Sequence, residues 1–156
     1  MANAGLRPRI MAIDYGTKRM GLAVSDPLGI TAQGLETLEH TNVENDLRHI
    51  ENLAEEYSPE RVIVGNPLGA RGNETAMSKR AAAFAGKLRR RLPCPVELWD
   101  ERGTSVEANR VLRESGMGIE KRRRAVDRVA VTLLLQSYLD RRAFDAAHIQ
   151  HQQPQE

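Results

Sequence analysis

Two short apolar segments lie near the start of the chain, at residues 10–13 and 20–24, on either side of a turn around Gly16. Each segment is too short for an amphipathic helix, so the pattern predicts two buried strands joined by a hairpin. Residues 30–38 follow a second turn and have the pattern of a third, weaker strand. Three strands joined by tight turns predict an antiparallel meander.

The chain then alternates between helical and extended patterns. Apolar residues recur with helical spacing over residues 43–57, 74–91 and 126–144. Short apolar runs at residues 61–64 and 96–99 predict two more buried strands. Because parallel strands require crossover connections that cover a sheet, this order predicts an α/β fold. We expect a five-stranded mixed sheet, made of the antiparallel meander of three strands plus two parallel strands and flanked by helices.

Two segments before the last helix have different patterns. Thr104 and Glu107 have the spacing of a capping box, which predicts a helix that begins there and stops near Gly116. Residues 116–124 contain glycine and many basic residues but no apolar period, so we expect a mobile loop there.

A chain of 156 residues suits a single domain with one core. We expect a flexible lead-in at residues 1–8, one domain at residues 9–146 and a disordered polar tail at residues 147–156. Cys94 is the single cysteine, so a disulfide framework or a zinc cluster is excluded and a packing role is expected. No signal peptide or run of membrane length is found, which favours a cytoplasmic protein without membrane contact.

Charge is distributed unevenly, although the formal net charge is only +2. Basic residues gather at residues 87–91 and 121–128, and acidic residues at residues 44–60. A basic face would suit a phosphate-rich partner, whereas the alternative is an ordinary solvated helix surface. Aromatic residues make up 4% of the chain, too few for an obvious base-stacking platform. A nucleic acid would therefore be held mainly by its backbone.

Carboxylates stand at the ends of the predicted elements. Asp14 closes the first strand, the pair Asp100-Glu101 closes the last, and Asp127 falls in the first turn of the last helix. Taken singly, Asp14 could cap its own turn and Asp127 could interact with the helix dipole. In α/β folds, however, ligands gather at the carboxyl ends of neighbouring strands. Three converging carboxylates would suit divalent cations such as Mg2+, and two such ions about 4 Å apart would clamp a phosphodiester for hydrolysis.

Four motifs follow one another along the chain. They read IDYGTKRMGLAVSD at residues 13–26, VGNPLGARG at 64–72, WDERGTSVEA at 99–108 and AVDRVAV at 125–131. On these motifs the chain resembles the YqgF (RuvX) family, whose members are described as Holliday junction resolvases and as nucleases that process the precursor of 16S ribosomal RNA. The resemblance implies an RNase H-like fold and a hydrolase that uses Mg2+ or Mn2+.

The resemblance also implies an acidic triad of Asp14, Glu101 and Asp127, which would act as catalytic residues and as metal ligands. Strand parity alone does not choose between Asp100 and Glu101, whereas the resemblance favours Glu101 and makes Asp100 a neighbour that orients it or is solvated. The chain departs from the usual family pattern, without losing a triad carboxylate, at Arg71, Gly103 and Ala125.

Basic residues beside these carboxylates and in the predicted loop are candidates for binding phosphates. They are Lys18, Arg19, Arg102, Lys121, Arg122, Arg123 and Arg124. Lys18 and Arg19 could instead be exposed charges of a plain hairpin, and Arg102 could form a salt bridge with a carboxylate. The four histidines show no ligand spacing on any one element and are assigned no chemistry.

The favoured hypothesis is a metal-dependent endonuclease acting on structured nucleic acid, with precursor 16S rRNA as the first candidate substrate and branched DNA as the alternative. A second hypothesis is a non-catalytic nucleic-acid-binding module, although such a module has no reason to keep three acids in place. A third is a nucleotide-binding kinase or ATPase, because IDYGT resembles the phosphate-binding turn of the actin and sugar-kinase superfamily, but that architecture needs two related domains. We expect a monomer or a homodimer, the latter if junctions are resolved symmetrically.

Overall fold

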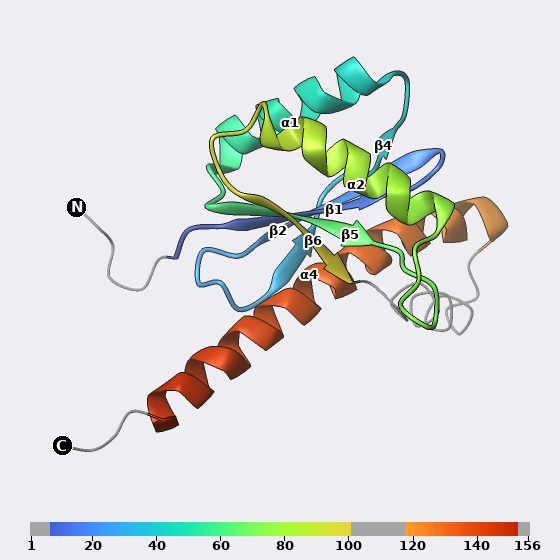
Figure 1. Cartoon of the computed structure of the whole chain (residues 1–156). Coiled ribbons are helices and arrows are strands. Elements are labelled where there is room, and N and C mark those ends of the chain that lie inside the picture. Colours follow the sequence, from blue (N-terminus) through green and yellow to red (C-terminus); the bar gives the residue numbers. More distant parts are fainter. Residues whose placement is uncertain (1–6, 101–117, 153–156) are drawn as a thin grey trace.

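The computed structural model describes residues 7–100 and 118–152 of the chain. Within these residues, six strands form one mixed sheet, with α1 and α2 on one face and α4 on the other (Figure 1). The elements are β1 (Ile10–Tyr15), β2 (Arg19–Ser25), β3 (Ala32–Gly34), β4 (Leu38–Glu39), α1 (Val43–Tyr57), β5 (Arg61–Asn66), α2 (Ala76–Arg89), β6 (Val96–Asp100) and α4 (Ile119–Gln152).

The order of strands across the sheet is β3-β2-β1-β5-β6. β1 and β2 are antiparallel, whereas β5 is parallel to both β1 and β6. The two parallel pairs follow from the helical crossovers, since α1 connects β4 to β5 and α2 connects β5 to β6. The predicted α/β architecture, with a mixed sheet flanked by helices, is therefore confirmed.

The third strand of the predicted meander is divided in two. In place of one strand at residues 30–38, the short strands β3 and β4 each pair with β2. The β3 ladder ends at Gly34, where α4 approaches so closely that a Cβ would lie 2.8 Å from Cγ of Arg128. This edge of the sheet is therefore irregular.

The last helix is longer than its apolar period. α4 has 34 residues and runs from Ile119 to Gln152, so the loop predicted at residues 116–124 is helical from Ile119 onward. The prediction of a disordered tail at residues 147–156 is wrong as far as Gln152. Lys, Arg, Glu, Gln and Ala are good helix formers, so charged and polar residues extend the helix without an apolar face. Despite this length, neither α4 nor any other described helix is apolar enough to cross a lipid bilayer.

Alternating residues of β1 pack into two separate hydrophobic cores. Met11 and Ile13 belong to the core beneath α1 and α2, whereas Ile10 and Ala12 belong to the core beneath α4. Since side chains alternate along a strand, Asp14 has the parity of Ala12 and lies on the α4 face. The sequence of β1 therefore directs its one carboxylate towards α4.

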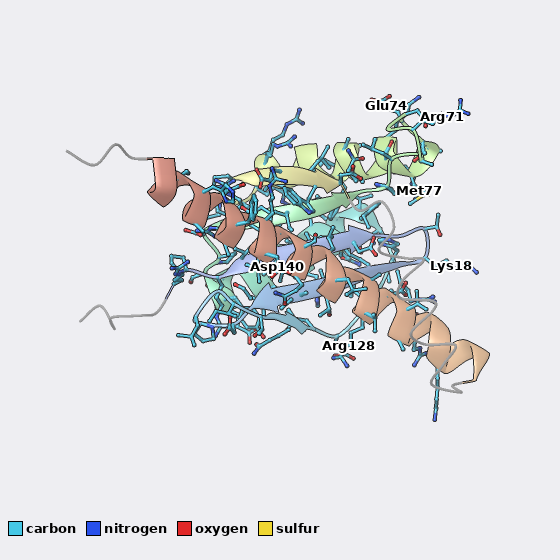
Figure 2. The ribbon with its side chains drawn as sticks, turned by 90° about the horizontal axis from the view of Figure 1, so that it is seen from below. Lys18, Arg71, Glu74, Met77, Arg128 and Asp140 are labelled. Carbon is cyan, nitrogen blue, oxygen red and sulfur yellow. The ribbon has the colours of Figure 1, made fainter. Side chains whose placement is uncertain are left out.

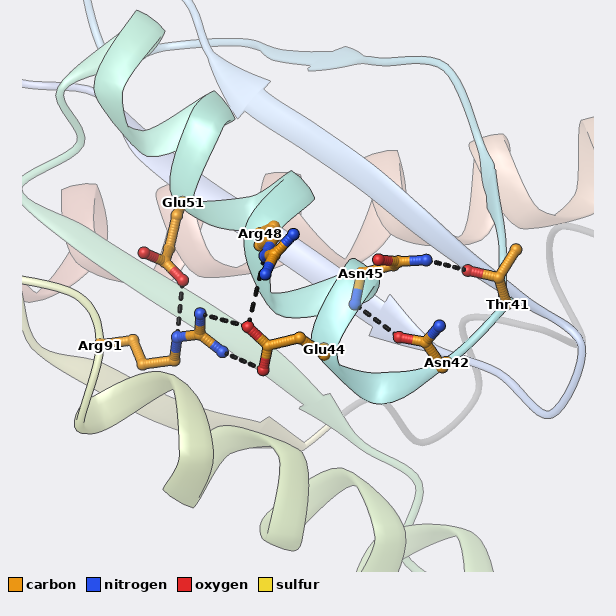
Figure 3. A network of polar contacts seen from close by, with 7 residues as sticks. All are labelled: Thr41, Asn42, Glu44, Asn45, Arg48, Glu51 and Arg91. Atoms are coloured by element: carbon orange, nitrogen blue, oxygen red, sulfur yellow. Dashed lines mark hydrogen bonds and ion pairs between the residues drawn. The ribbon is translucent and has the colours of Figure 1, made fainter.

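Polar contacts at one end of the molecule join α1 to the segment that follows α2 (Figure 3). Nη1 and Nη2 of Arg91 donate to the two carboxylate oxygens of Glu44 at 2.8 and 2.9 Å, and its Nε lies 2.6 Å from Oε1 of Glu51. The side chain of Asn42 caps α1 by accepting from the backbone N–H of Asn45. Exposed ion pairs contribute little individually, but this bidentate geometry connects α1 to the segment that follows α2.

Candidate functional site

Asp14 and Asp127 lie on the same side of the sheet because α4 packs directly on β2. Asp14 pairs across the hairpin with Gly21, which points to the same face. A Cβ on Gly21 would lie 2.8 Å from the backbone oxygen of Asp127 and 3.3 Å from Cβ of Val131. Only a glycine leaves room for the helix here. The backbone of α4 at Asp127 therefore lies directly against Gly21 of β2, the residue opposite Asp14.

Asp127 is held by Arg19, the first residue of β2. Nε of Arg19 donates to Oδ2 of Asp127 at 2.6 Å, and the two side chains are 23% and 29% exposed. Because α4 begins at Ile119, Asp127 lies two turns inside the helix instead of in its first turn. The helix dipole acts mainly within the first turn, which removes that alternative role for Asp127.

The carboxyl end of β6 approaches the same face. Trp99 points towards α4, where its Nε1 donates to Oγ of Ser137 at 3.0 Å and its ring meets the Tyr138 ring edge-on. Leu98 belongs to the opposite core, so by alternation Asp100 lies on the face away from α4. Asp100 therefore does not share a face with Asp14.

Part of the predicted site falls in residues 101–117. Glu101, Arg102, Gly103 and the predicted capping box of Thr104 and Glu107 lie outside the described residues. The side chains of Arg122 and Arg123 are likewise not described, although their backbone belongs to α4.

A basic groove adjoins the contact between Arg19 and Asp127. It has a volume of about 640 Å3 and is lined on the α4 side by Lys121, Arg124, Ala125 and Arg128. The opposite side is formed by Arg19 together with Glu36, Thr37 and Glu39. The lining thus contains four cations and two carboxylates, which favours an anionic ligand such as a phosphate backbone.

Arg128 lies in the basic run at residues 121–128, but it is the one cation of the groove that was not among the predicted phosphate-binding residues. It follows Arg124 by four residues, so both lie on one face of α4. That spacing was not informative while residues 116–124 were expected to be a loop. Figure 2 shows that the N-terminal half of α4, which carries Arg128, reaches the end of the molecule where Lys18 lies at the tip of the β1–β2 turn.

The chemistry of these side chains suits a hard divalent cation. Asp14 and Asp127 offer carboxylate oxygens, the ligands that Mg2+ and Mn2+ prefer. No cluster of three or more possible ligands is found in residues 7–100 and 118–152, a range that does not include Glu101. Two carboxylates on one face are compatible with a metal site that Glu101 would complete.

Cys94 takes no part in this site. It packs against the core beneath α1 and α2, and burial raises the pKa of its thiol. A thiol with a raised pKa forms little thiolate at neutral pH, which is consistent with the predicted packing role.

A mixed sheet with helices on both faces, with Asp14 on the α4 side of β1 and Asp127 on α4 itself, is the arrangement expected of an RNase H-like fold. The chain belongs to the RuvX family: the family model, described as Holliday junction resolvase, matches residues 8–141. Its relatives include a protein from Koribacter versatilis that is 51% identical over 137 residues, covering 88% of this chain and 90% of the relative. A relative from Moorella thermoacetica is 44% identical over 133 residues, covering 85% and 95%. Both are named as pre-16S rRNA nucleases.

Solved structures with the same fold are more distant in sequence. RuvC from T. thermophilus, in complex with a Holliday junction substrate, matches with a TM-score of 0.56 and 18% identity, covering 88% of this chain and 97% of RuvC. The Holliday junction resolvase of Fowlpox virus matches with a TM-score of 0.50 and 16% identity, covering 85% and 98%. These similarities confirm the RNase H-like fold.

Proposed function

We propose that the chain is a metal-dependent endonuclease that hydrolyses phosphodiester bonds in the precursor of 16S rRNA. The observation that carries the proposal is the position of Asp14 and Asp127, which are far apart in sequence but lie on one face of the sheet beside a basic groove. The relatives named as pre-16S rRNA nucleases support the choice of substrate.

Asp14, Glu101 and Asp127 would hold the metal ions. Bound Mg2+ or Mn2+ would supply an activated water and stabilise charge on the phosphate. Glu101 is chosen over Asp100 on two grounds, the family motif and the position of Asp100 on the face away from α4.

The chain's own cations would bind and orient the substrate. Lys121, Arg124 and Arg128 would hold backbone phosphates in the groove. Arg102, Arg122 and Arg123 stay candidates for further phosphate contacts on the basis of the sequence. Arg19 would have two roles, because a guanidinium that donates to Asp127 through Nε retains N–H donors on both Nη atoms. Lys18 lines an adjoining groove with Thr17 and Glu39 and would contact a more distant phosphate.

Branched DNA is the second candidate substrate, because the family model and the solved structures of the same fold are named for resolvases. A phosphate-binding groove with few aromatic residues does not select RNA over DNA. Symmetrical cleavage of a junction would require a two-fold dimer, whereas cleavage of an RNA precursor would not.

The test is cleavage of a 16S rRNA precursor fragment and a DNA four-way junction, side by side, with Mg2+ or Mn2+. We expect Asp14→Asn and Asp127→Asn each to abolish cleavage, because a neutral amide replaces a metal ligand of the same shape, while each changes the free energy of unfolding by less than about 1 kcal/mol. Asp145→Asn, at an exposed carboxylate farther along α4, is the control and should remain active. Full activity of Asp14→Asn would remove Asp14 from the mechanism, and binding without cleavage by the wild-type protein would favour the non-catalytic module.

A further inference from the structure

His40, which follows β4, connects the β1–β2 hairpin to α1. Its Nδ1 lies 2.8 Å from Oδ2 of Asp46 on α1, and its Nε2 lies 2.7 Å from the backbone oxygen of Gly16. The backbone N–H of His40 also donates to the backbone oxygen of Lys18 at 3.0 Å. One residue therefore contacts the hairpin turn at two points and α1 at a third.

The turn that His40 contacts separates two residues of the candidate site, Asp14 and Arg19. It is closed by a hydrogen bond of 2.9 Å from the backbone N–H of Gly16 to the oxygen of Arg19, and a Cβ on Gly16 would lie 2.6 Å from that oxygen. A shift of the Gly16 carbonyl would move both ends of the turn. His40 is thus placed to position the site from the opposite side of the sheet.

Two oxygen atoms, from Asp46 and Gly16, contact the His40 ring, and they determine how many protons His40 and Asp46 carry together. A backbone carbonyl only accepts, so Nε2 of His40 must carry a hydrogen. A second proton must lie between Nδ1 and the carboxylate of Asp46, since two lone pairs at 2.8 Å would repel. A neutral imidazole with an ionised Asp46 has one N–H and can keep only one of these contacts.

Both side chains of this pair are shielded from solvent. The side chains of His40 and Asp46 are only 15% and 3% exposed, and Oδ1 of Asp46 has no hydrogen-bond partner among the described residues. His40 is therefore the one described side chain that compensates this buried carboxylate.

Other charged and titratable groups surround the pair. The His40 ring lies 4.8 Å from the Tyr15 ring, and burial and the charge of Asp46 raise the pKa of Tyr15, while Arg80 on α2 acts in the opposite direction. The groove on the solvent side of His40 is lined by Lys18, Arg19 and Glu39. None of these groups replaces the contact between Nδ1 and Asp46.

We propose that His40 and Asp46 form a protonated positioning pair that holds the hairpin between Asp14 and Arg19, and that loss of the shared proton at rising pH loosens this hairpin. The consequence for cleavage rests on the proposed nuclease function, whereas the protonation of the pair and the order of the hairpin do not.

The direct test uses nuclear magnetic resonance on the full chain over a pH series from acidic to alkaline conditions. The 15N shifts of the His40 ring report whether both nitrogens carry protons, and amide exchange protection of Gly16 and His40 reports the order of the hairpin. In the wild-type protein we expect two N–H groups at the acidic end, then loss of one and an approximately tenfold loss of protection as pH rises.

Asp46→Asn separates the charge from the geometry. An amide can donate to Nδ1 of a neutral His40, whose Nε2–H still reaches Gly16, so hairpin protection should become independent of pH in this variant. His40→Gln should lose protection at every pH, and His148→Gln, at an exposed histidine near the end of α4, should behave as wild type. A neutral His40 throughout the range with undiminished protection would overturn the proposal.

Cleavage measurements on the same variants distinguish the positioning pair from the proposed nuclease function. With the substrate that is cut, the wild-type rate should fall relative to Asp46→Asn as pH rises through the same range. If the resonance experiment succeeds but neither substrate is cut by the wild-type protein, the nuclease assignment fails and the positioning pair stands. Parallel pH profiles for wild type and Asp46→Asn would show that the pair does not influence the site.

Discussion

The hydrogen bond from Arg19 to Asp127 combines two expectations that were made separately from the sequence. Arg19 was expected to bind phosphate and Asp127 to bind metal, yet their side chains are joined at 2.6 Å. The contact lies between elements more than a hundred residues apart, so no local pattern predicts it. His40 and Asp46 are close in sequence but belong to different elements, so ligand spacing on a single element does not predict their pairing.

Gly21 allows a residue-scale test of how closely α4 must approach β2. Gly21→Ala should destabilise the protein by about 1–3 kcal/mol and reduce cleavage, because its Cβ would collide with the backbone oxygen of Asp127, which cannot move without the helix. Chemical denaturation measures the first effect, and the cleavage assay measures the second.

Gly86→Ala is the matched control for that substitution. A Cβ there meets nothing within 4 Å, and Gly86 lies inside α2, so the change should stabilise the protein by about 0.5–1 kcal/mol. If Gly21→Ala were as stable and as active as the wild-type protein, the close packing of α4 on β2 would not be required.

At the scale of elements, the predictions that rested on apolar patterns were the accurate ones. The strands of the central sheet and the helix α1 match the predicted ranges closely because burial imposes a period that the sequence displays. α4 was underestimated at both ends because its first and last turns show no apolar period. Because residues 116–124 were expected to form a loop, there was no reason to place Arg124 and Arg128 on one face, and the groove was not predicted.

The basic groove gives a prediction for α4 as an element. Arg124→Gln and Arg128→Gln should each weaken nucleic-acid binding and reduce the slope of log K against log salt by about 0.7 to 0.9, because each removes one cation from the phosphate backbone. Binding titrations at several salt concentrations measure the slope. The Arg128 side chain also donates to the backbone oxygen of Leu35 at 3.3 Å, so Arg124→Gln is the cleaner variant.

Arg141→Gln is the control, because Arg141 is an exposed arginine on the same helix that pairs with Asp145 away from the groove. It should leave the salt slope unchanged. Equal slopes for Arg124→Gln and the wild-type protein would place the nucleic acid elsewhere on the surface.

At the scale of the whole molecule, the sheet separates two cores and also carries the site. Asp14, Gly21 and Trp99 lie on the α4 face for the same reason that Ala12 and Ala23 are buried there, namely the alternation of strand residues. The sequence could therefore predict that carboxylates would gather at one edge, but not which of Asp100 and Glu101 would face the helix. The place of Glu101 in the triad stays a prediction from the family motif.

The extent of the folded domain can be tested by shortening α4. Among the described side chains of α4, the last buried ones are Tyr138 and Leu139, and the last ion pair with the rest of the molecule joins Arg142 to Glu60 at 2.7 Å. Beyond this point Phe144 and Ile149 are 54% and 62% exposed. A chain that ends at residue 146 should therefore unfold within about 0.5 kcal/mol of the full chain and keep its cleavage activity.

Two further variants, a shorter chain and a core substitution, provide the comparison for that experiment. A chain that ends at residue 136 loses Tyr138, Leu139 and the pair with Glu60, so it should unfold at a clearly lower denaturant concentration. Leu135→Ala, at a fully buried position in the retained part of α4, should cost about 2–5 kcal/mol because it leaves a cavity against the sheet. The contrary result is that ending the chain at residue 146 lowers the free energy of unfolding as much as Leu135→Ala does. In that case the exposed end of α4 would stabilise the fold, and the domain boundary at residue 146 would be wrong.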